Sequence, residues 1–595
     1  MRDIARSIRL LLGTSFRHAP LASTVACLAV VASALSALNA LWIGILVDGL
    51  IRHDTAHVTW AVVALIGTVT IDWTLGAAGA EARVVIAERT GFMLDRRIGA
   101  ILSGAPGIGH FERPEVADEV QIVRQNRQIL GGGLASLLYN VDSTITAAIT
   151  LITAGLVDPR LLLLTLTAVP SLIGSRLQYR RTQAGQEESA VPGRRARHLS
   201  EALNSPDTGM ELRVFGAGEA MRAMLRRTVR AWRRPVSTAQ TEAAGIAFVE
   251  DALFAVVLGS VVSWLVWSAT RGGGAATAVV IAVVAARQIQ QAMVSTVYGV
   301  GGAGGLIDTA RLVGRIFRLE EWAAADRRRY AGRAEPPAVL TAGIELHGVG
   351  FDYGTGRGPA LQDVSVRLPA GQVIAVVGEN GAGKSTLVKL LIGLYRPDSG
   401  RITVDGIDLR AFSIEDWRAR STATFQDHAD FEFTVLDTVG VGDRSADTES
   451  AVPQAMRRSG ADDVLPSLPQ GLATQLGVRW DGGVDLSGGQ WQKLALARGM
   501  MRDRPVLLLL DEPTSALDAT AEEALFDRYA AAARAATGRG AITVLVTHRF
   551  STVRAADRIL VLSGGRVIED GTHAELMAAG GHYAELYRLQ AKGYR

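Results

Sequence analysis

Eight consecutive residues in the second half of the chain have the types and spacing needed to bind phosphate groups. They are Gly378, Glu379, Asn380, Gly381, Ala382, Gly383, Lys384 and Ser385, followed by Thr386, and they fit the pattern G-x-x-x-x-G-K-[ST]. In such a loop the backbone N–H groups surround the phosphates, the lysine reaches the β- and γ-phosphates, and the serine hydroxyl can bind Mg²⁺. The sequence therefore predicts a site for ATP and Mg²⁺.

The lysine of this loop stands out against the composition of the chain. Only four of the 62 basic residues are lysines, namely Lys384, Lys389, Lys493 and Lys592, and the rest are arginines. This bias indicates a GC-rich genome and does not indicate nucleic-acid binding. Arginine cannot replace the compact ammonium group of lysine inside a tight loop, so a lysine at position 384 indicates a chemical requirement.

The elements around the loop occur in the order that an ATPase requires. The apolar run 373–377 predicts a buried strand leading into the loop, and 387–394 predicts the helix after it. A second apolar run, 506–510, ends in Asp511 and Glu512. Asp511 is then placed to bind the metal, and Glu512 to polarise the attacking water as a general base. On its own this acidic pair could be an ordinary strand-end turn, but the phosphate loop disfavours that interpretation.

Length and composition limit the class of protein. A chain of 595 residues exceeds the usual size of one hydrophobic core, so two or more domains are expected. The single cysteine, Cys27, lies in an apolar run. It excludes an internal disulfide framework and a zinc site built from cysteines, and we interpret it as a packing residue.

The N-terminal half is predicted to be an α-helical membrane domain. Six stretches are long and apolar enough to cross a bilayer, near 21–50, 57–80, 132–157, 159–178, 245–269 and 274–300. The long connecting segments 81–131 and 179–244 are rich in arginine, whereas the other loops are short. The positive-inside rule then places both long loops and both termini in the cytoplasm. An arginine-containing stretch before the first span suits an interfacial helix.

Four ionisable residues fall within the predicted spans, at about the same depth: Asp72, Asp142, Asp251 and Arg287. Two interpretations remain open. Arg287 could pair with one of the acids and stabilise helix packing, or the acids could line a cavity that favours cationic or amphiphilic cargo.

Composition changes again near the middle of the chain. Residues 326–342 contain a run of charges and then Glu335-Pro336-Pro337, which is typical of a linker. From Ile344 onward short β-type runs alternate with helical patterns, which predicts an α/β domain with a largely parallel core sheet. The expected domains are 1–325 (membrane), 326–342 (linker) and 343–595 (ATPase).

These features together resemble the ATP-binding cassette superfamily, specifically exporters with a six-span domain ahead of the cassette. The residues Leu486 to Gln490 match the family signature Leu-Ser-Gly-Gly-Gln. The resemblance implies that Tyr353 stacks on adenine, that Gln426 senses Mg²⁺ and contacts the membrane domain, and that His548 contacts the γ-phosphate. It also implies that Ser515 to Asp518 joins the two nucleotide sites. The implied fold is an exporter-type helical domain followed by an α/β cassette.

The same resemblance implies a dimer. Ser487, Gly488, Gly489 and Gln490 would cap the γ-phosphate held by the phosphate loop of a second subunit, so one chain is half a transporter. The partner could be an identical or a different chain. Segments 110–115 and 211–216 resemble the coupling helices of this group, although ordinary helix packing is the alternative. The stretch from Trp480 to Gly483 and the stretch after Gln426 depart from the family pattern.

The expected activity is ATP-driven export of a small amphiphilic molecule or a peptide across the bacterial cytoplasmic membrane, with membrane lipid around the chain. Lipid flipping and import of a metal chelate are the alternatives, and a membrane-anchored regulatory ATPase is the least favoured one. The predicted spans exclude the soluble cassette ATPases that act on ribosomes or DNA. The sequence does not identify the cargo.

Overall fold

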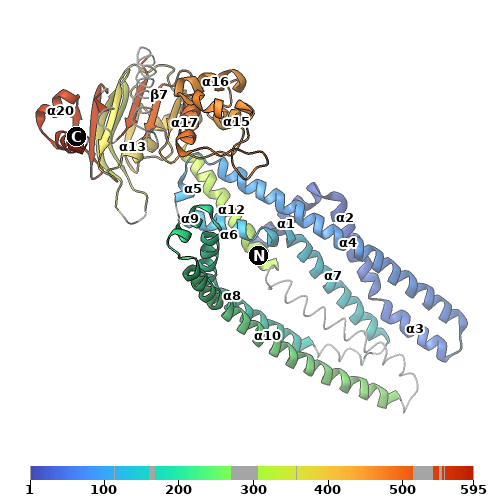
Figure 1. The fold of residues 1–595 in the computed structure, drawn as a ribbon. Coiled ribbons are helices and arrows are strands. Elements are labelled where there is room, and N and C mark those ends of the chain that lie inside the picture. The colour runs from blue at the N-terminus through green and yellow to red at the C-terminus, as the bar shows by residue number, and fades with distance from the viewer. Residues whose placement is uncertain are drawn as a thin grey trace. The chain divides into compact units, whose positions relative to one another are not determined.

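The chain divides into two compact units (Figure 1). The computed structural model describes residues 2–112, 114–157, 159, 168–269, 306–354, 356, 358–512, 540–547, 553–554 and 556–593. Met1–Ala100 and Glu119–Glu320 form the first unit, and Ile101–Asp118 and Glu321–Arg595 form the second. The second unit therefore combines the C-terminal half with a short segment from the N-terminal half.

The N-terminal half is helical throughout its described residues. Its helices are α1 (Arg2–His18), α2 (Pro20–Ser36), α3 (Asn39–Ile51), α4 (Thr55–Ser103), α5 (Gly109–Glu112), α6 (Pro114–Gln125), α7 (Arg127–Val157), α8 (Ala168–Asn204), α9 (Pro206–Val214), α10 (Gly218–Ala269) and α12 (Leu306–Arg329). Helices α8 and α10 run side by side over much of their length (Figure 1).

Among the described residues, four stretches are long and apolar enough to cross a membrane. They are Pro20–Ile51, Thr55–Ser103, Ile129–Thr153 and Gly218–Trp264. These stretches contain or overlap four of the six predicted spans. The predicted span 159–178 is described only in part, and the predicted span 274–300 lies outside the described residues.

Two of the four ionisable residues predicted inside the spans, Asp72 and Asp142, lie close enough for their charges to interact. Asp142 on α7 accepts a hydrogen bond from Ser33 on α2, and the charges of Arg83 and Asp72 on α4 act on it. Asp251 lies on an exposed part of α10. Arg287 lies outside the described residues, so its predicted pairing with an acid stays a prediction.

Ion pairs connect α12 to other helices of the first unit. Glu119 on α6 accepts hydrogen bonds from Arg315 (2.9 Å) and Arg318 (3.0 Å) on α12, and Arg97 on α4 donates to Glu320 (2.7 Å). Burial alone would raise the pKa of Glu119, but the hydrogen bonds from Arg318 and Arg315 outweigh it and hold the pKa below its usual range. The paired form of Glu119 is therefore the charged one.

The second unit contains two sheets. A four-stranded antiparallel sheet has the order β2-β1-β4-β5, and a six-stranded sheet has the order β10-β9-β3-β8-β7-β6. All neighbours in the larger sheet are parallel except β10 with β9. The strands are β1 (Gly343–Phe351), β2 (Leu361–Pro369), β3 (Val373–Gly378), β4 (Ser399–Val404), β5 (Ile407–Asp408), β6 (Ser421–Thr424), β7 (Leu507–Asp511), β8 (Ile542–Val546), β9 (Arg558–Ser563) and β10 (Arg566–Gly571).

Helices cover these sheets. They are α13 (Lys384–Leu391), α14 (Ile414–Ala419), α15 (Val435–Gly440), α16 (Thr448–Ser459), α17 (Gly488–Gly499), α20 (His573–Ala579) and α21 (His582–Gly593), with short 3₁₀ turns at Leu409–Ala411, Ala461–Ser467 and Gly471–Ala473. The predicted α/β architecture of this half is confirmed.

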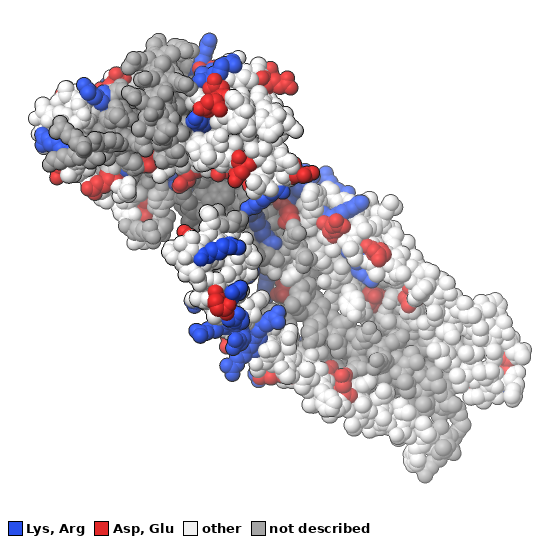
Figure 2. All heavy atoms as spheres, in the orientation of Figure 1, with Lys and Arg blue, Asp and Glu red and all other residues white. Residues whose placement is uncertain are grey.

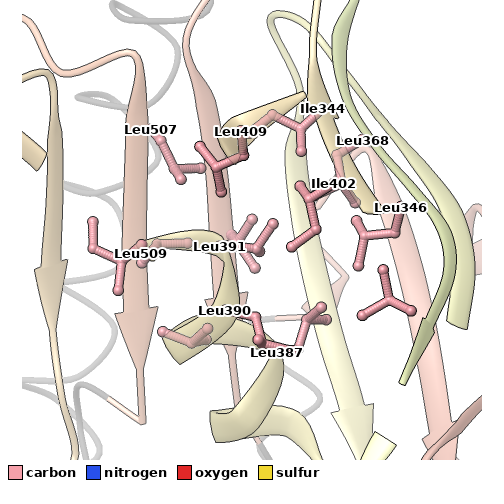
Figure 3. Close-up of a cluster of buried hydrophobic side chains, with 14 of the residues drawn as sticks. Ile344, Leu346, Leu368, Leu387, Leu390, Leu391, Ile402, Leu409, Leu507 and Leu509 are labelled. Atoms are coloured by element: carbon pink, nitrogen blue, oxygen red, sulfur yellow. The ribbon is translucent and has the colours of Figure 1, made fainter. Parts of the chain in front are cut away.

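The apolar residues of β7 are buried on both faces of the sheet. Leu507 and Leu509 belong to one core, together with Leu387, Leu390 and Leu391 of α13 (Figure 3). Leu508 and Leu510 belong to a second core beneath α15, α16 and α17. A strand buried on both faces reads as a continuous apolar run, which is why the sequence 506–510 identified it.

The segment predicted as a linker packs against residues distant in the sequence. Helix α12 runs to Arg329, and Asp326 accepts a hydrogen bond from the backbone N–H of Gly107 at 2.9 Å. Next along the chain, the Tyr330 hydroxyl donates to the carbonyl of Leu394 at 3.2 Å. Burial raises the pKa of Tyr330 to about 12, so its hydroxyl remains a donor at any physiological pH.

Replacement of Trp417 tests the packing of the core that contains Leu507 and Leu509. Its side chain is fully buried, and its indole N–H donates to the carbonyl of Leu391 at 3.0 Å. We expect Trp417→Ala to destabilise this unit by about 3–5 kcal/mol, since it leaves a cavity and an unpaired carbonyl. Thermal unfolding of the full chain in lipid nanodiscs checks this. Trp480→Ala is the matched control, because that indole is 54% exposed, and an equal effect of both changes would contradict the assignment.

Candidate nucleotide-binding site

The phosphate loop and the acidic pair lie at the same edge of the six-stranded sheet. Val546 at the end of β8 pairs with Val376 of β3 on one side and with Asp511 of β7 on the other. Asp511 therefore lies level with Val376, just before β3 ends at Gly378 and the loop begins. Ligands of parallel sheets bind at this carboxyl edge.

Two glycines of the loop occupy positions that a side chain would block. Gly378 has φ 151°, and a Cβ atom there would lie 2.2 Å from the carbonyl oxygen of Leu562. Gly383 has φ 102°, and a Cβ atom would lie 2.6 Å from the carbonyl oxygen of Ala360. Both conformations favour glycine, and they let the loop turn sharply into α13 at Lys384.

The Lys384 ammonium lies over the phosphate loop. Its Nζ donates to the carbonyl oxygens of Gly378 and Glu379, each at 2.9 Å. Burial lowers the pKa of Lys384, and the charges of Glu512 and Asp511 act in the opposite direction. These electrostatic interactions bring the lysine predicted to bind phosphate together with both predicted acids.

Asp511 has the environment of a metal ligand. Its side chain is buried and bonded to the hydroxyl of Ser385, while its Oδ1 atom has no hydrogen-bond partner. Burial raises the pKa of Asp511, and the negative charge of Glu512 adds to this effect. A buried carboxylate oxygen without a partner, beside a serine hydroxyl, is the oxygen donor set that Mg²⁺ prefers when phosphates complete its shell. The residues present therefore fit Mg²⁺.

Glu512 has an unusual backbone conformation. Its φ is 48°, in the left-handed region that residues other than glycine rarely adopt, and its N–H donates to the carbonyl of Val546 at 3.0 Å. Strained backbone of this kind costs on the order of 1–3 kcal/mol and is concentrated at functional sites.

Tyr353, predicted to stack on adenine, lies beside the helix that follows the loop. Its hydroxyl is 3.1 Å from the Thr386 hydroxyl, and its ring meets the rings of Phe351 and Tyr395 edge-on. The Lys389 ammonium lies 5.6 Å from the centre of the Tyr353 ring. The structure thus brings Tyr353 to the phosphate loop through Thr386.

The signature residues begin helix α17. Ser487 is the N-cap: its hydroxyl accepts a hydrogen bond from the N–H of Gln490, and the Gln490 side chain accepts one from the N–H of Ser487. Gly488 and Gly489 form the first positions of the helix, where backbone N–H groups have no partner within the helix. Helix α17 packs on α15, α16 and β6, whereas α13 packs on β3, β7 and β8, so the two motifs belong to different parts of the unit.

Among the other residues predicted for the site, Gln426 is described and His548 is not. Gln426 is exposed in the segment after β6. Thr547 is buried after β8, and its N–H lies 3.4 Å from the carbonyl oxygen of Val376. His548 and Ser515 to Asp518 lie outside the described residues.

The structure shows a contact that the sequence did not indicate, between the divergent stretch 480–483 and Glu432, the residue directly after the divergent stretch 427–431. The Trp480 indole N–H donates to the Glu432 carboxylate at 3.2 Å, and the Gln475 amide donates to the Glu432 carbonyl at 2.8 Å. Phe431 and Phe433 are the residues before and after Glu432 in the sequence. Their rings stack on each other. Both stretches were visible as departures, but no sequence signal linked them.

Comparison with known proteins agrees with this geometry. Residues 361–515, which include the phosphate loop, the signature and Asp511, match the sequence profile of the ABC transporter family. The resemblance of this segment to the ABC transporter family is thereby confirmed. The predicted bounds of the cassette, 343–595, stay a prediction.

Curated relatives match this chain over part of their length. The ATP-dependent lipid A-core flippase of Chromohalobacter salexigens is 41% identical over 254 residues, which is 43% of this chain and 42% of that relative. The mycobactin import ATP-binding/permease protein IrtB of Mycolicibacterium smegmatis is 41% identical over 261 residues, or 44% of this chain and 43% of that relative. The chain therefore aligns with less than half the length of each.

A solved structure extends the similarity over nearly the whole chain. A bacterial Atm1-family ABC exporter with ATP bound has a TM-score of 0.71, and the match covers 95% of this chain and 98% of the exporter. At 21% sequence identity, this similarity establishes the fold: a helical N-terminal domain fused to an ABC ATPase domain.

We expect the buried carboxylate of Asp511 to destabilise the nucleotide-free protein, although the proposed metal site requires it. Because burial raises its pKa, Asp511 contributes most stability at low pH, and this contribution is lost as the pH rises through its folded-state pKa. We expect Asp511→Asn to raise the melting temperature of the nucleotide-free protein at pH 7.5 by about 2–4 °C, the shift that about 1 kcal/mol gives in a domain of this size. The gain should shrink at acid pH.

Scanning fluorimetry of the full chain in nanodiscs measures this difference. The exposed Asp481→Asn serves as the control and should leave the melting temperature unchanged. A lower melting temperature for Asp511→Asn at pH 7.5 would show that the carboxylate stabilises the empty site.

Proposed function

We propose that the chain is half of an ATP-driven transporter that binds ATP and Mg²⁺ at Gly378 to Thr386 and exports an amphiphilic molecule as a dimer. The observation that carries this proposal is the meeting of Lys384, Ser385, Asp511 and Glu512 at one sheet edge. The described part of the same chain contains four helical stretches that can cross a membrane. A hydrolase site joined to membrane helices supports transport.

The chemistry follows from the positions of the side chains. Lys384 and the backbone N–H groups at the start of α13 hold the phosphates. Ser385 and Asp511 would hold Mg²⁺, which would neutralise charge on the phosphate oxygens. Glu512 accepts a proton from the water that attacks the γ-phosphate, and the leaving group is ADP. Tyr353 stacks on the adenine and His548 contacts the γ-phosphate. Gln426 would sense whether Mg²⁺ is bound.

A second subunit completes the site. The N-terminus of α17, with Ser487, Gly488 and Gly489, binds the γ-phosphate held by the partner's loop. The packing of α17 and α13 on different parts of the unit supports this arrangement, because neither motif covers the other within one chain. The partner is an identical or a different half-transporter.

The segments 110–115 and 211–216, which resemble coupling helices, link ATP hydrolysis to transport. Helix α9 presents Met210 (72% exposed) and Val214 (80%), and its C-cap residue Phe215 is 75% exposed. In the other predicted coupling segment, His110 is buried, and its ring lies 5.4 Å from Trp322. An exposed apolar helix face of this kind supports docking on an ATPase surface.

Charged residues are unevenly distributed along helices α8 and α10. This distribution supports the proposed orientation of the chain in the membrane. Arginines gather at the ends of these helices near α9, including the exposed Arg226, Arg230 and Arg233 (Figure 2). The opposite ends are largely uncharged (Figure 2). By the positive-inside rule the arginine-rich ends, the cassette and both termini lie in the cytoplasm of a bacterial cell.

The direction of transport and the cargo class have two alternatives. One relative's name states lipid flipping and another's states import, so a flippase or an importer of a metal chelate remains the second candidate. A membrane-anchored regulatory ATPase is disfavoured by the long membrane helices. Cargo movement into sealed inside-out vesicles separates these possibilities.

Glu512→Gln tests the catalytic assignment. The amide cannot accept the proton, so we expect ATP turnover in nanodiscs to fall at least about a hundredfold. ATP binding should persist. Glu449→Gln, an exposed control, should retain wild-type turnover. A wild type that binds ATP without turnover would indicate a different partner subunit, and full turnover in Glu512→Gln would remove Glu512 from the mechanism.

Val214→Asp tests the coupling assignment. Burial of an apolar side chain contributes about 1.5–3 kcal/mol, so a charge here should weaken docking and lower turnover about tenfold or more while ATP binding persists. Met224→Asp is a matched control, because Met224 is also exposed (45%) but lies on α10. Equal effects of both changes would contradict a specific role for α9.

A further inference from the structure

A cavity lies at the amino edge of the six-stranded sheet, within the second unit. Its volume is about 520 Å³, and its lining includes Thr422 of β6, Leu508 of β7 and Ala541, the residue before β8. The candidate nucleotide site lies at the opposite edge, where β7 ends at Asp511. Leu508 and Asp511 are separated by about 10 Å along the strand, so this cavity is distinct from the nucleotide site.

The walls of this cavity contain several apolar side chains. Val339 belongs to the segment before β1, Met500 follows α17, and Pro505 and Val506 lead into β7. Met500 and Val506 are buried, whereas Val339 is 51% exposed. Small-molecule sites have this size and combine apolar walls with a few polar groups.

Charged residues complete the described lining, and they are four arginines and one acid: Arg420, Arg458, Arg502, Arg504 and Asp503. Two of the arginines are held by backbone carbonyls. Arg458 donates to the carbonyl of Met500, and Arg502 donates to those of Arg418 and Ser421. A carbonyl orients a guanidinium without removing its charge, so both side chains remain cationic.

Neighbouring acids offset three of these four positive charges. Asp503 pairs with Arg458, Glu335 pairs with Arg420 at 2.7 Å, and the charge of Asp443 acts on Arg502. The side chains of Asp503 and Glu335 are 69% and 78% exposed. Ion pairs this exposed contribute little to stability, so an anionic ligand can compete with these two acids.

Arg504 is the fourth arginine, and its charge is not offset. Its side chain is exposed, and no carboxylate within the described part of the chain pairs with it. Four arginines and three acids therefore leave one net positive charge at the cavity. A guanidinium presents its N–H donors in a planar fork that matches a carboxylate or a phosphate group.

We propose that this cavity binds an organic anion, with its carboxylate or phosphate group against Arg504 and its apolar body along Val339, Met500 and Pro505. The site lies outside the ATPase machinery and goes beyond the proposed function. A bound anion would contact the end of α17, which begins with the signature, and the start of β7, which ends at Asp511. A neutral molecule of the same shape would gain the apolar contacts without the charge interaction.

Two substitutions separate the contribution of charge from that of space. Arg504→Gln removes the charge that is not offset, and Arg401→Gln is its matched control, because Arg401 is exposed on β4 and is not in the lining. Ala338 is an exposed residue of the lining, so Ala338→Trp should cover the cavity without altering an arginine. Ala578→Trp, at an exposed position of α20, is the control for the added bulk.

The test uses photolabelling of the full chain in phosphatidylcholine nanodiscs without nucleotide. The probe is a benzoate that carries a trifluoromethyl diazirine, and the comparison probe is the corresponding benzyl alcohol. Labelled positions are located by peptide mass spectrometry, which separates this cavity from the phosphate loop. Thermal unfolding of every variant shows that it is folded.

We expect the benzoate to label the segments 338–339 and 499–508. Labelling at a fixed probe concentration should fall about tenfold in Arg504→Gln, the difference between a charged and a neutral partner. It should be lost in Ala338→Trp and unchanged in Arg401→Gln and Ala578→Trp. The alcohol should label these segments weakly, and equally in wild type and Arg504→Gln.

Two results would overturn the assignment of this cavity. One is benzoate labelling of these segments that is equal in wild type, Arg504→Gln and Ala338→Trp, and the other is labelling by the alcohol as strong as that by the benzoate. If one variant fails to fold, the other decides the question, because one changes charge and the other changes space. Labelling requires no ATP turnover, so its outcome is independent of the proposed transport function.

Discussion

The register of three parallel strands determines where every charged group of the nucleotide site lies. Val546 of β8 pairs with both Val376 and Asp511, so the end of β7 is held level with the end of β3. Because β7 is buried on both faces, a shift along its neighbours would remove apolar residues from two cores at once. The register is therefore held by apolar packing, and the position of the acids follows from it.

Burial gives the groups at this edge their chemical character. It lowers the pKa of Lys384 and raises that of Asp511, and the two act on one another across the loop. An arrangement of this kind is costly when empty and favourable when a metal and phosphates provide the missing charge and ligands. Glu512 adds backbone strain at the same place. Burial of charge and backbone strain thus occur together at this edge of the sheet.

In the helical unit, too, a buried carboxylate is accommodated by its neighbours. Glu250 is accommodated between α8 and α10 because Gln178 donates to it and Gly174 leaves room for it. Ion pairs such as Glu119 with Arg315 connect helices outside the apolar stretches. In both units a buried carboxylate accepts a hydrogen bond from a neighbouring side chain, Asp511 from Ser385 and Glu250 from Gln178.

The sequence by itself determined the phosphate loop, the buried strands around it, the signature and four of the membrane stretches, since these depend on neighbouring residues and short-range periodicity. Tertiary structure decided the rest. Only strand order brings Asp511 to Lys384, and only helix pairing buries Glu250 beside Gln178, because contacts between distant segments follow from packing and leave no local pattern. The same reason explains why the contact of Trp480 with Glu432, and that of Gly107 with Asp326, could not be predicted.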